Sequence, residues 1–195
     1  MTQLPTRAEA LELMHEYTES ASLRRHMYAV EAAMRAYAEK YGQDIELWGL
    51  TGLIHDFDYE RWPNDAHSPT EEHPSSGVAI LRDRGWPEEV LDAVMAHADY
   101  TGVPATTLMA KTLRAVDELA GFITACALVR PTRISDLGAR SVKKKLKDKA
   151  FAAAVSRQDI REGQEALGED VTEHIEFVVA AMRNIADELG LQSNA

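Results

Sequence analysis

Apolar residues recur every three or four positions along most of the chain, and no segment alternates with the period of two that marks a half-buried strand. In the clearest stretch they occupy Leu23, Met27, Val30 and Met34, on one face of a helix that Gly42 would end. The pattern predicts about eight or nine helices, over roughly residues 6–17, 20–42, 44–55, 74–85, 86–97, 106–130, 142–155, 156–167 and 170–189.

Residue types at the ends of these segments support the helical interpretation. Thr6 and Glu9 have the spacing of a capping box, and Asp44 and Ser141 can accept hydrogen bonds at the starts of two other helices. Pro131 cannot continue a helix and therefore stops the long segment before it. The expected fold class is all-α, a compact bundle.

The chain is expected to form one domain over residues 1–195. Its length suits a single hydrophobic core, and no repeat, low-complexity tract or change of composition marks a boundary. The C-terminal helices, within 132–190, should pack on the part that precedes them. Residues 58–72 form one long polar loop, and loops of this length inside compact domains are usually functional or disordered. We favour a functional loop.

The composition argues against several classes of protein. Its net charge of −11, from 21 basic and 32 acidic residues, argues against binding to a nucleic-acid polymer. No stretch approaches the roughly 20 apolar residues of a membrane span, and the N-terminus does not resemble a signal peptide. The single cysteine, Cys126, cannot form an internal disulfide and fits a reducing compartment. We expect a cytoplasmic monomer or homodimer.

The most informative stretch is 50–58, in which His55 and Asp56 are flanked by apolar residues on both sides. An imidazole and a carboxylate are costly to bury unless something binds them, and a metal ion commonly binds such a pair. Other candidate ligands lie in helical or loop segments before and after the pair: His26, His73, His97 and Asp117. Taken singly, each of these could instead be a core histidine, a cap or a solvated carboxylate.

The order of these residues resembles that of the HD superfamily of metal-dependent phosphohydrolases. His26, then His55 with Asp56, then Asp117 correspond to the minimal ligand set of that family. The two intervening histidines correspond to those of its two-metal members. The resemblance covers roughly residues 20–121 and implies that this part is the metal-binding core of an HD-type helical bundle.

The resemblance also implies how the ligands would be shared. Asp56 would bridge two ions. One site would be completed by His26, His55 and Asp117, and the other by His73 and His97. A mixed set of nitrogen and oxygen donors suits one or two divalent transition ions, from among Mn, Fe, Co, Ni and Zn, better than Mg or Ca.

Such ions lower the pKa of bound water and neutralise phosphoryl oxygens. The expected activity is therefore a phosphatase or phosphodiesterase acting on a small phosphorylated substrate, such as a nucleotide or cyclic nucleotide. The alternative is a mixed-valent di-iron HD-type oxygenase that cleaves a C–C or C–P bond, because some relatives such as myo-inositol oxygenase share the six ligands. A third hypothesis is a non-catalytic binding module, which an intact ligand set disfavours.

Further candidates surround the ligands. Asp58 and Glu72 could hydrogen-bond to the ligands or carry a proton to the leaving group, although loop solvation would also explain them. The candidate contacts to substrate phosphate are Arg25, His67, Arg130, Lys143 and Lys144. The lysines belong to a basic run over 143–149 that could equally be a solvated face. His15 and His174 are expected to be solvated, and Glu118 to be more exposed than Asp117.

Overall fold

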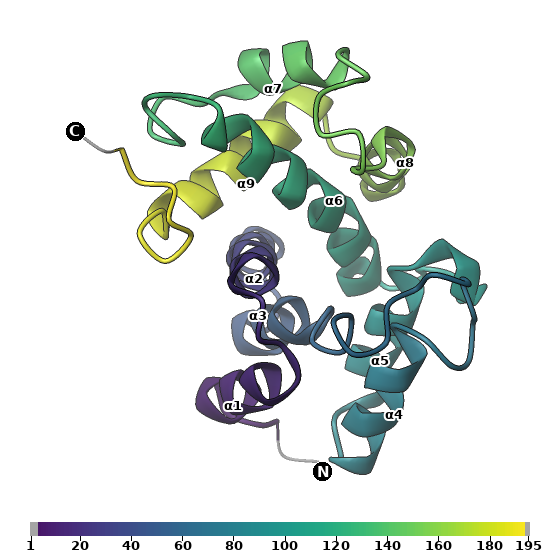
Figure 1. Cartoon of the computed structure of the whole chain (residues 1–195). Helices are drawn as coiled ribbons and strands as arrows, with labels where there is room; N and C mark the ends of the chain where they lie inside the picture. The colour runs from purple at the N-terminus through teal and green to yellow at the C-terminus, as the bar shows by residue number, and fades with distance from the viewer. Residues whose placement is uncertain (1–3, 194–195) are drawn as a thin grey trace.

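The computed structural model describes residues 4–193, and within that range it contains nine α-helices, one short 3₁₀ helix and no strand. The prediction of an all-α fold is confirmed (Figure 1). The elements, in chain order, are α1 (Arg7–Tyr17), α2 (Ala21–Tyr41), α3 (Ile45–Ile54), α4 (Ser75–Asp83), α5 (Glu88–Ala96), η1 (Asp99–Thr101), α6 (Leu108–Leu128), α7 (Ala139–Leu146), α8 (Arg157–Leu167) and α9 (Val171–Asn184).

Most helix starts are set by side chains that accept a hydrogen bond from a backbone N–H in the first turn, which would otherwise lack a partner. The residues that cap in this way are Thr6, Ser20, Asp44, Thr107, Ser156 and Asp170. The capping box of Thr6 and Glu9 is present as predicted. Gly42 and Gly168 end α2 and α8 in the left-handed conformation that glycine adopts without strain.

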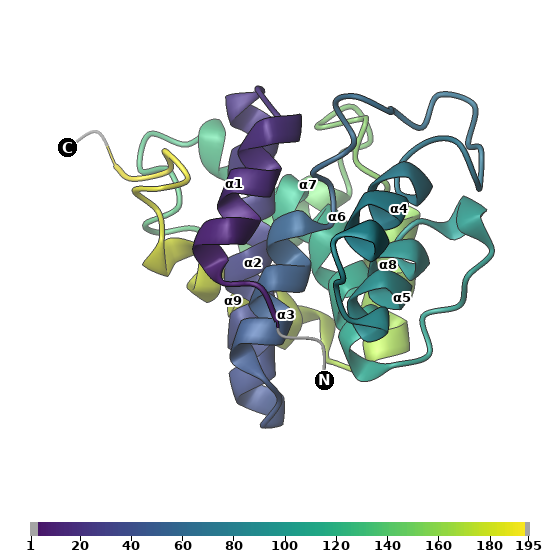
Figure 2. The same ribbon diagram turned by 90° about the horizontal axis from the view of Figure 1, so that it is seen from below.

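Two long helices, α2 and α6, organise the bundle (Figures 1 and 2). Helix α2 packs against α3, α6 and α9, and α6 also packs against α5, α7 and α8. The α4–α5 pair lies at one end of the molecule and α7 at the other (Figure 1). Within the described residues, no helix is both long and apolar enough to span a bilayer.

Helix α3 is buried on all sides over its last seven residues, 48–54. Gly52 allows it to approach α2 closely, because a Cβ there would lie 3.0 Å from the backbone of Glu31. A helix surrounded in this way cannot rotate or shift without disturbing the core. The core therefore holds the end of α3, where His55 and Asp56 follow, in a defined position.

Both boundaries of the basic helix predicted over 142–155 are wrong. Helix α7 begins after Gly138, where Glu176 of α9 accepts a hydrogen bond from the Ala139 N–H at 2.6 Å, and it ends at Leu146. Residues 147–155 form turns, because Arg157 donates hydrogen bonds to several backbone carbonyls of that segment. The last helix is also shorter than predicted and ends at Asn184.

His174 is not solvated, contrary to the prediction; it is 1 % exposed. Its Nδ1 accepts a hydrogen bond from the Tyr37 hydroxyl at 2.6 Å, and its Nε2 donates to the Ala115 carbonyl at 3.0 Å. Burial lowers the pKa of His174, which keeps the ring neutral and suits this pairing. The imidazole therefore connects α9 to both α2 and α6.

Helix α8 packs so closely on α6 that Gly163→Ala should destabilise the protein. The new Cβ would lie 2.8 Å from the Cα of Ala115 and 2.9 Å from the Arg114 carbonyl, and backbone cannot easily yield. We expect a loss of about 1–3 kcal/mol in the free energy of unfolding, measured by urea denaturation. Gly121→Ala is the control, because its Cβ would meet only His26 Nδ1, at 3.9 Å.

Helix propensity alone predicts that both substitutions stabilise the fold by up to about 1 kcal/mol. A destabilised Gly163→Ala beside an unchanged or stabilised Gly121→Ala would therefore isolate the packing effect. Equal stabilisation of the two variants would contradict the close contact between α8 and α6.

Candidate metal centre

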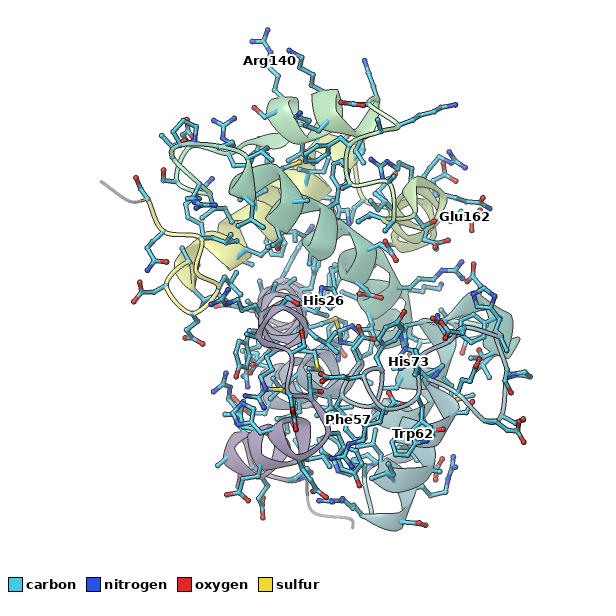
Figure 3. All side chains as sticks on the ribbon, viewed as in Figure 1. His26, Phe57, Trp62, His73, Arg140 and Glu162 are labelled. Carbon is cyan, nitrogen blue, oxygen red and sulfur yellow. The ribbon has the colours of Figure 1, made fainter. Side chains whose placement is uncertain are left out.

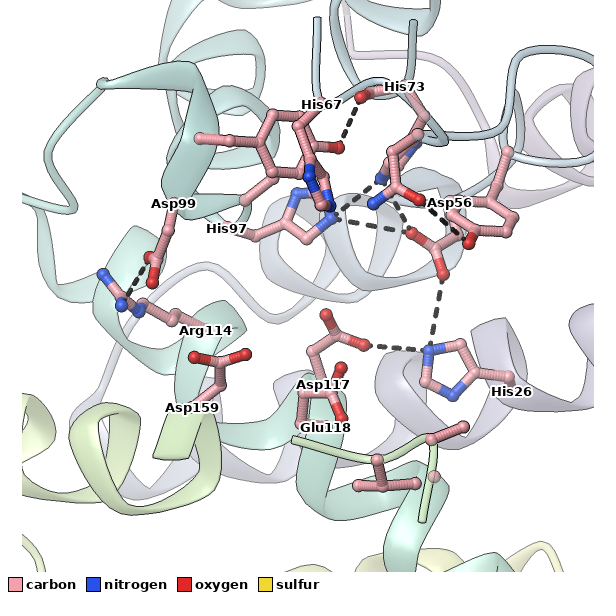
Figure 4. Close-up of a pocket in the computed structure, with 17 residues that line it drawn as sticks. His26, Asp56, His67, His73, His97, Asp99, Arg114, Asp117, Glu118 and Asp159 are labelled. Carbon is pink, nitrogen blue, oxygen red and sulfur yellow. Dashed lines mark hydrogen bonds and ion pairs between the residues drawn. The ribbon is translucent and has the colours of Figure 1, made fainter. Parts of the chain in front are cut away.

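Five segments deliver the predicted ligands to one place. His26 lies on α2, His55 and Asp56 follow α3, His73 precedes α4, His97 follows α5, and Asp117 lies on α6. Figure 4 shows most of these side chains converging from separate helices onto Asp56, and Figure 3 places the site between α2 and α5. The structure thus brings all six predicted ligands together.

The first cluster consists of His26, His55, Asp56 and Asp117. Asp117 Oδ1 lies 2.9 Å from His26 Nε2 and 3.3 Å from His55 Nε2. Asp56 Oδ2 lies 3.4 Å from His55 Nε2 and 3.6 Å from His26 Nε2. The four donor atoms all lie within 4.8 Å of one another, as donors around a single ion would.

The second cluster consists of Asp56, His73 and His97. Asp56 Oδ1 lies 3.3 Å from His73 Nε2 and 3.6 Å from His97 Nε2, and the two Nε2 atoms are 3.1 Å apart. Asp56 therefore belongs to both clusters and presents one carboxylate oxygen to each.

Hydrogen bonds donated by Nδ1 orient three of the four imidazoles. His55 Nδ1 donates to the Gly52 carbonyl at 2.8 Å, and His97 Nδ1 donates to the carbonyl of Val94. His73 Nδ1 donates to Asp58 Oδ1 at 2.7 Å. This pairing leaves each Nε2 with its lone pair facing the centre, which is the form that binds a metal.

Asp58 thus serves to position His73, one of the two roles predicted for it. Its side chain is 1 % exposed, and its second oxygen accepts a hydrogen bond from the Gly77 N–H at 2.7 Å. Because both oxygens are occupied and shielded, Asp58 cannot carry a proton to a leaving group as arranged here. That part of the prediction is corrected.

The electrostatics of the site favour a bound cation. Burial opposes ionisation of Asp117, yet His55 and His26 hold its pKa well below the usual range. Burial also opposes protonation of His55, while the carboxylates of Asp56 and Asp117 raise its pKa well above 6.5. The carboxylates of Asp56 and Asp117, whose side chains are 14 % and 17 % exposed, contact imidazoles and need positive charge, from protons or from a metal ion.

The donor set itself fits divalent transition ions. Four imidazole nitrogens and two carboxylates form the mixed N/O environment that such ions accept, whereas Mg and Ca prefer oxygen alone.

A third group of neighbouring side chains in the described part of the chain is entirely acidic and consists of Asp99, Asp159 and Glu162. Arg114 already forms ion pairs with Asp99 and Glu162, so this group has a protein cation as its partner.

A cavity of about 430 Å³ opens above the clusters. The loop that follows α3 contributes Tyr59, Asn64 and His67 to its lining, and η1 contributes Tyr100, whose ring lies 4.9 Å from that of His67. Across the cavity from His67, the wall carries Arg114, Glu118 and Asp159 (Figure 4). Of the predicted substrate contacts, His67 lines this cavity.

Two cavity residues were missed or misplaced by the sequence interpretation. Arg114 was not a candidate, although it precedes Asp117 by one helical turn and therefore shares its face of α6. Glu118 was not a candidate either; it is half-buried and accepts a hydrogen bond from the Ser156 N–H at 3.0 Å. Burial, with the nearby Asp117 carboxylate, raises the pKa of Glu118 to about 7.

Glu72 and Arg25 do not line the cavity, contrary to the prediction. The Glu72 carboxylate accepts hydrogen bonds from two backbone N–H groups, those of Ala66 and Ser68, and so stabilises its own loop. Arg25 adjoins His26 in the sequence, but adjacent residues point in different directions from a helix. Its guanidinium lies near Gly190 instead.

The other predicted phosphate contacts, Arg130, Lys143 and Lys144, are also absent from the cavity. Lys143 donates to the Thr172 hydroxyl at 2.9 Å. Arg130 and Lys144 line a different cavity near α7. Figure 3 shows Arg140 of α7 well separated from His73, so the basic run lies away from the metal centre.

Comparison with known proteins agrees with this geometry. No curated protein and no solved structure matches the chain. The family model of the HD domain, however, matches residues 23–121, the segment from which all six clustered side chains come. The resemblance inferred from the order of histidines and aspartates is thereby confirmed, and the chain belongs to the HD domain family, a superfamily of metal-dependent hydrolases.

Proposed function

We propose that this protein is a metal-dependent phosphohydrolase, a phosphatase or phosphodiesterase, that acts on a small phosphoester at the cavity above the two clusters. The observation that carries the proposal is the position of Asp56, which presents one oxygen to each cluster at the floor of an open cavity. The proposed ligands are those of the two clusters, with one or two divalent transition ions bound.

When bound, the ions would lower the pKa of coordinated water and neutralise phosphoryl oxygens. The contribution of the chain is to hold the donor atoms in place and to provide the walls. None of the described residues that line the cavity is a serine, threonine or cysteine. This composition favours direct attack by water over a covalent intermediate on the protein.

The charges of the cavity favour a substrate with a single phosphoryl group. Arg114 is the one lysine or arginine among its described lining residues, and it is already paired with Asp99 and Glu162. A di- or triphosphate would bring more negative charge than this wall can neutralise. The rings of Tyr59 and Tyr100 offer surfaces on which a base could stack, so a nucleoside monophosphate or cyclic nucleotide fits the proposal.

Arg114→Gln should raise KM more than it lowers kcat. Its loss would remove a cation from the cavity and leave Asp99 and Glu162 unpaired, so that this wall repels an anionic substrate. We expect KM to rise by about tenfold, measured by steady-state kinetics. Lys143→Gln removes the same charge outside the cavity and should leave both constants unchanged. An equal effect of both substitutions would contradict a role for Arg114.

A di-iron oxygenase that cleaves a C–C or C–P bond is the second candidate. It is favoured by the presence of both clusters, since the resemblance to two-metal oxygenases of this superfamily rests on these six ligands.

The deciding experiment combines metal analysis with an activity screen. Protein purified without chelators should contain a divalent transition metal and, with that metal added, should release product from mono- or cyclic nucleotides without oxygen. Turnover that strictly requires O₂ and iron would instead favour the oxygenase. Absence of turnover under both conditions, with the metal bound, would favour a binding module.

A further inference from the structure

The basic run that follows α6 lies beside a second cavity, of about 340 Å³, which we call the α6-end cavity. Arg130, Lys144 and Lys145 line it, and Asp148 is the one acidic residue among its described lining residues. In a chain with a net charge of −11, three cations around one concave surface make a local site that attracts anions.

These three cationic side chains have N–H donors available for a ligand. Lys144 is exposed and makes no hydrogen bond or ion pair with any residue that the structure describes. Lys145 lies over the Phe151 ring, with Nζ 4.4 Å from the centroid, a contact that leaves its N–H donors available. Arg130 pairs with Asp136 at 2.8 Å but is 28 % exposed, and a guanidinium has five N–H donors.

The one carboxylate among the lining residues, that of Asp148, already accepts hydrogen bonds from the backbone. Asp148 accepts hydrogen bonds from the backbone N–H groups of Ala150 and Phe151, at 3.1 and 3.3 Å. Asp148 therefore stabilises the turn after α7. Among the residues that the structure describes, it forms no ion pair with Lys144 or Lys145. The cavity keeps a net positive charge.

Apart from Ser141, the rest of the lining is apolar. Leu137 and Cys126 are buried there, and Val129 is 61 % exposed at the cavity. Burial raises the pKa of the Cys126 thiol to about 11, so it is neutral near pH 7 and adds no charge that would repel an anion. A ligand that covered this surface would gain from removing apolar area from water.

We propose that the α6-end cavity binds a small anion, a phosphate or carboxylate group joined to an aromatic or aliphatic body. Arg130, Lys144 and Lys145 bind the charged group, and Val129, which is exposed, contacts the apolar body. No residue lines both this cavity and the metal-centre cavity. Cys126 follows Asp117 by nine residues on α6, about 13 Å along the helix axis, so this site does not depend on the proposed hydrolase activity.

The test uses phenylphosphonate, whose C–P bond resists hydrolysis, and the full chain with its metal bound. Cys126 is the one cysteine of the chain and lines the cavity, where it is 2 % exposed, so methyl methanethiolsulfonate reaches its thiol through local opening that a ligand bound there would oppose. We expect phenylphosphonate to slow the modification in a saturable manner. Methylphosphonate, which lacks the ring, should need about tenfold higher concentration for the same protection.

Paired substitutions test whether the protection of Cys126 comes from a ligand bound at the α6-end cavity. Lys144→Gln with Lys145→Gln should raise the half-protecting concentration by about tenfold or more. The control, Lys147→Gln with Lys149→Gln, removes the same charge from exposed positions of the same segment that do not line the cavity, and should change it by less than about twofold. Cooperative urea unfolding verifies that each variant is folded.

Three results would overturn the proposal. Absence of protection at any concentration would show that the cavity does not bind such an anion. Equal shifts in the two pairs of variants would assign the effect to diffuse surface charge. If protection survived in the variant with Lys144→Gln and Lys145→Gln but disappeared in Asp56→Ala, the ligand would be bound at the metal centre instead.

Discussion

Replacing Asp56 with alanine should yield protein that carries essentially no transition metal and has lost activity by about a thousandfold or more. Asp56 is the one residue that belongs to both clusters, so its removal takes a donor from each. Elemental analysis of purified protein measures the first effect, and the phosphoester assay of the proposed function measures the second.

The helical fold should survive this substitution. The Asp56 side chain faces the cavity and lies outside the apolar core, so its truncation leaves the packing of the helices in place. Far-UV circular dichroism should therefore be unchanged. Asp92→Ala, at an exposed position on α5, is the matched control and should retain metal and activity. Full metal content in Asp56→Ala would refute the proposed centre.

Asp58→Ala should weaken metal binding selectively at the cluster of Asp56, His73 and His97. Without its carboxylate, the His73 ring loses the partner that sets its tautomer and orientation, and the Gly77 N–H loses its acceptor. Loss of such a partner typically weakens metal affinity by about 10–100-fold. Calorimetric titration of metal into chelator-treated protein measures this change, with the other cluster expected to keep its affinity.

Gly77→Ala offers an independent route to the same result. Its Cβ would lie 2.6 Å from Asp58 Cγ, so the carboxylate must move away from His73 although every ligand and carboxylate is retained. We expect the same selective weakening. If both variants bound metal as the unmodified chain does, Asp58 would have no positioning role. If both clusters weakened equally, the two would not be separable sites.

The sequence by itself determined the helical class and the identity of the metal-ligand candidates. Helical periodicity and capping are local properties, and Thr6, Asp44 and Gly42 act as their residue types predict. The candidate ligands could be recognised because imidazoles and carboxylates inside apolar segments are costly without a partner, as at His55. Their order along the chain then indicated the family, which the family comparison confirmed.

The tertiary structure alone decided which other charged residues reach the site. A cation on a helix can face a cavity or solvent with little change in local energy, so the distance of Lys144 from the metal centre was not visible in its local sequence, and Arg114 could be placed there only through Asp117, one turn further along α6. His174 likewise looked solvated until α2 and α6 supplied its partners. Pairing among segments far apart in the sequence sets these environments, because burial and hydrogen-bond satisfaction depend on the neighbours that folding brings together.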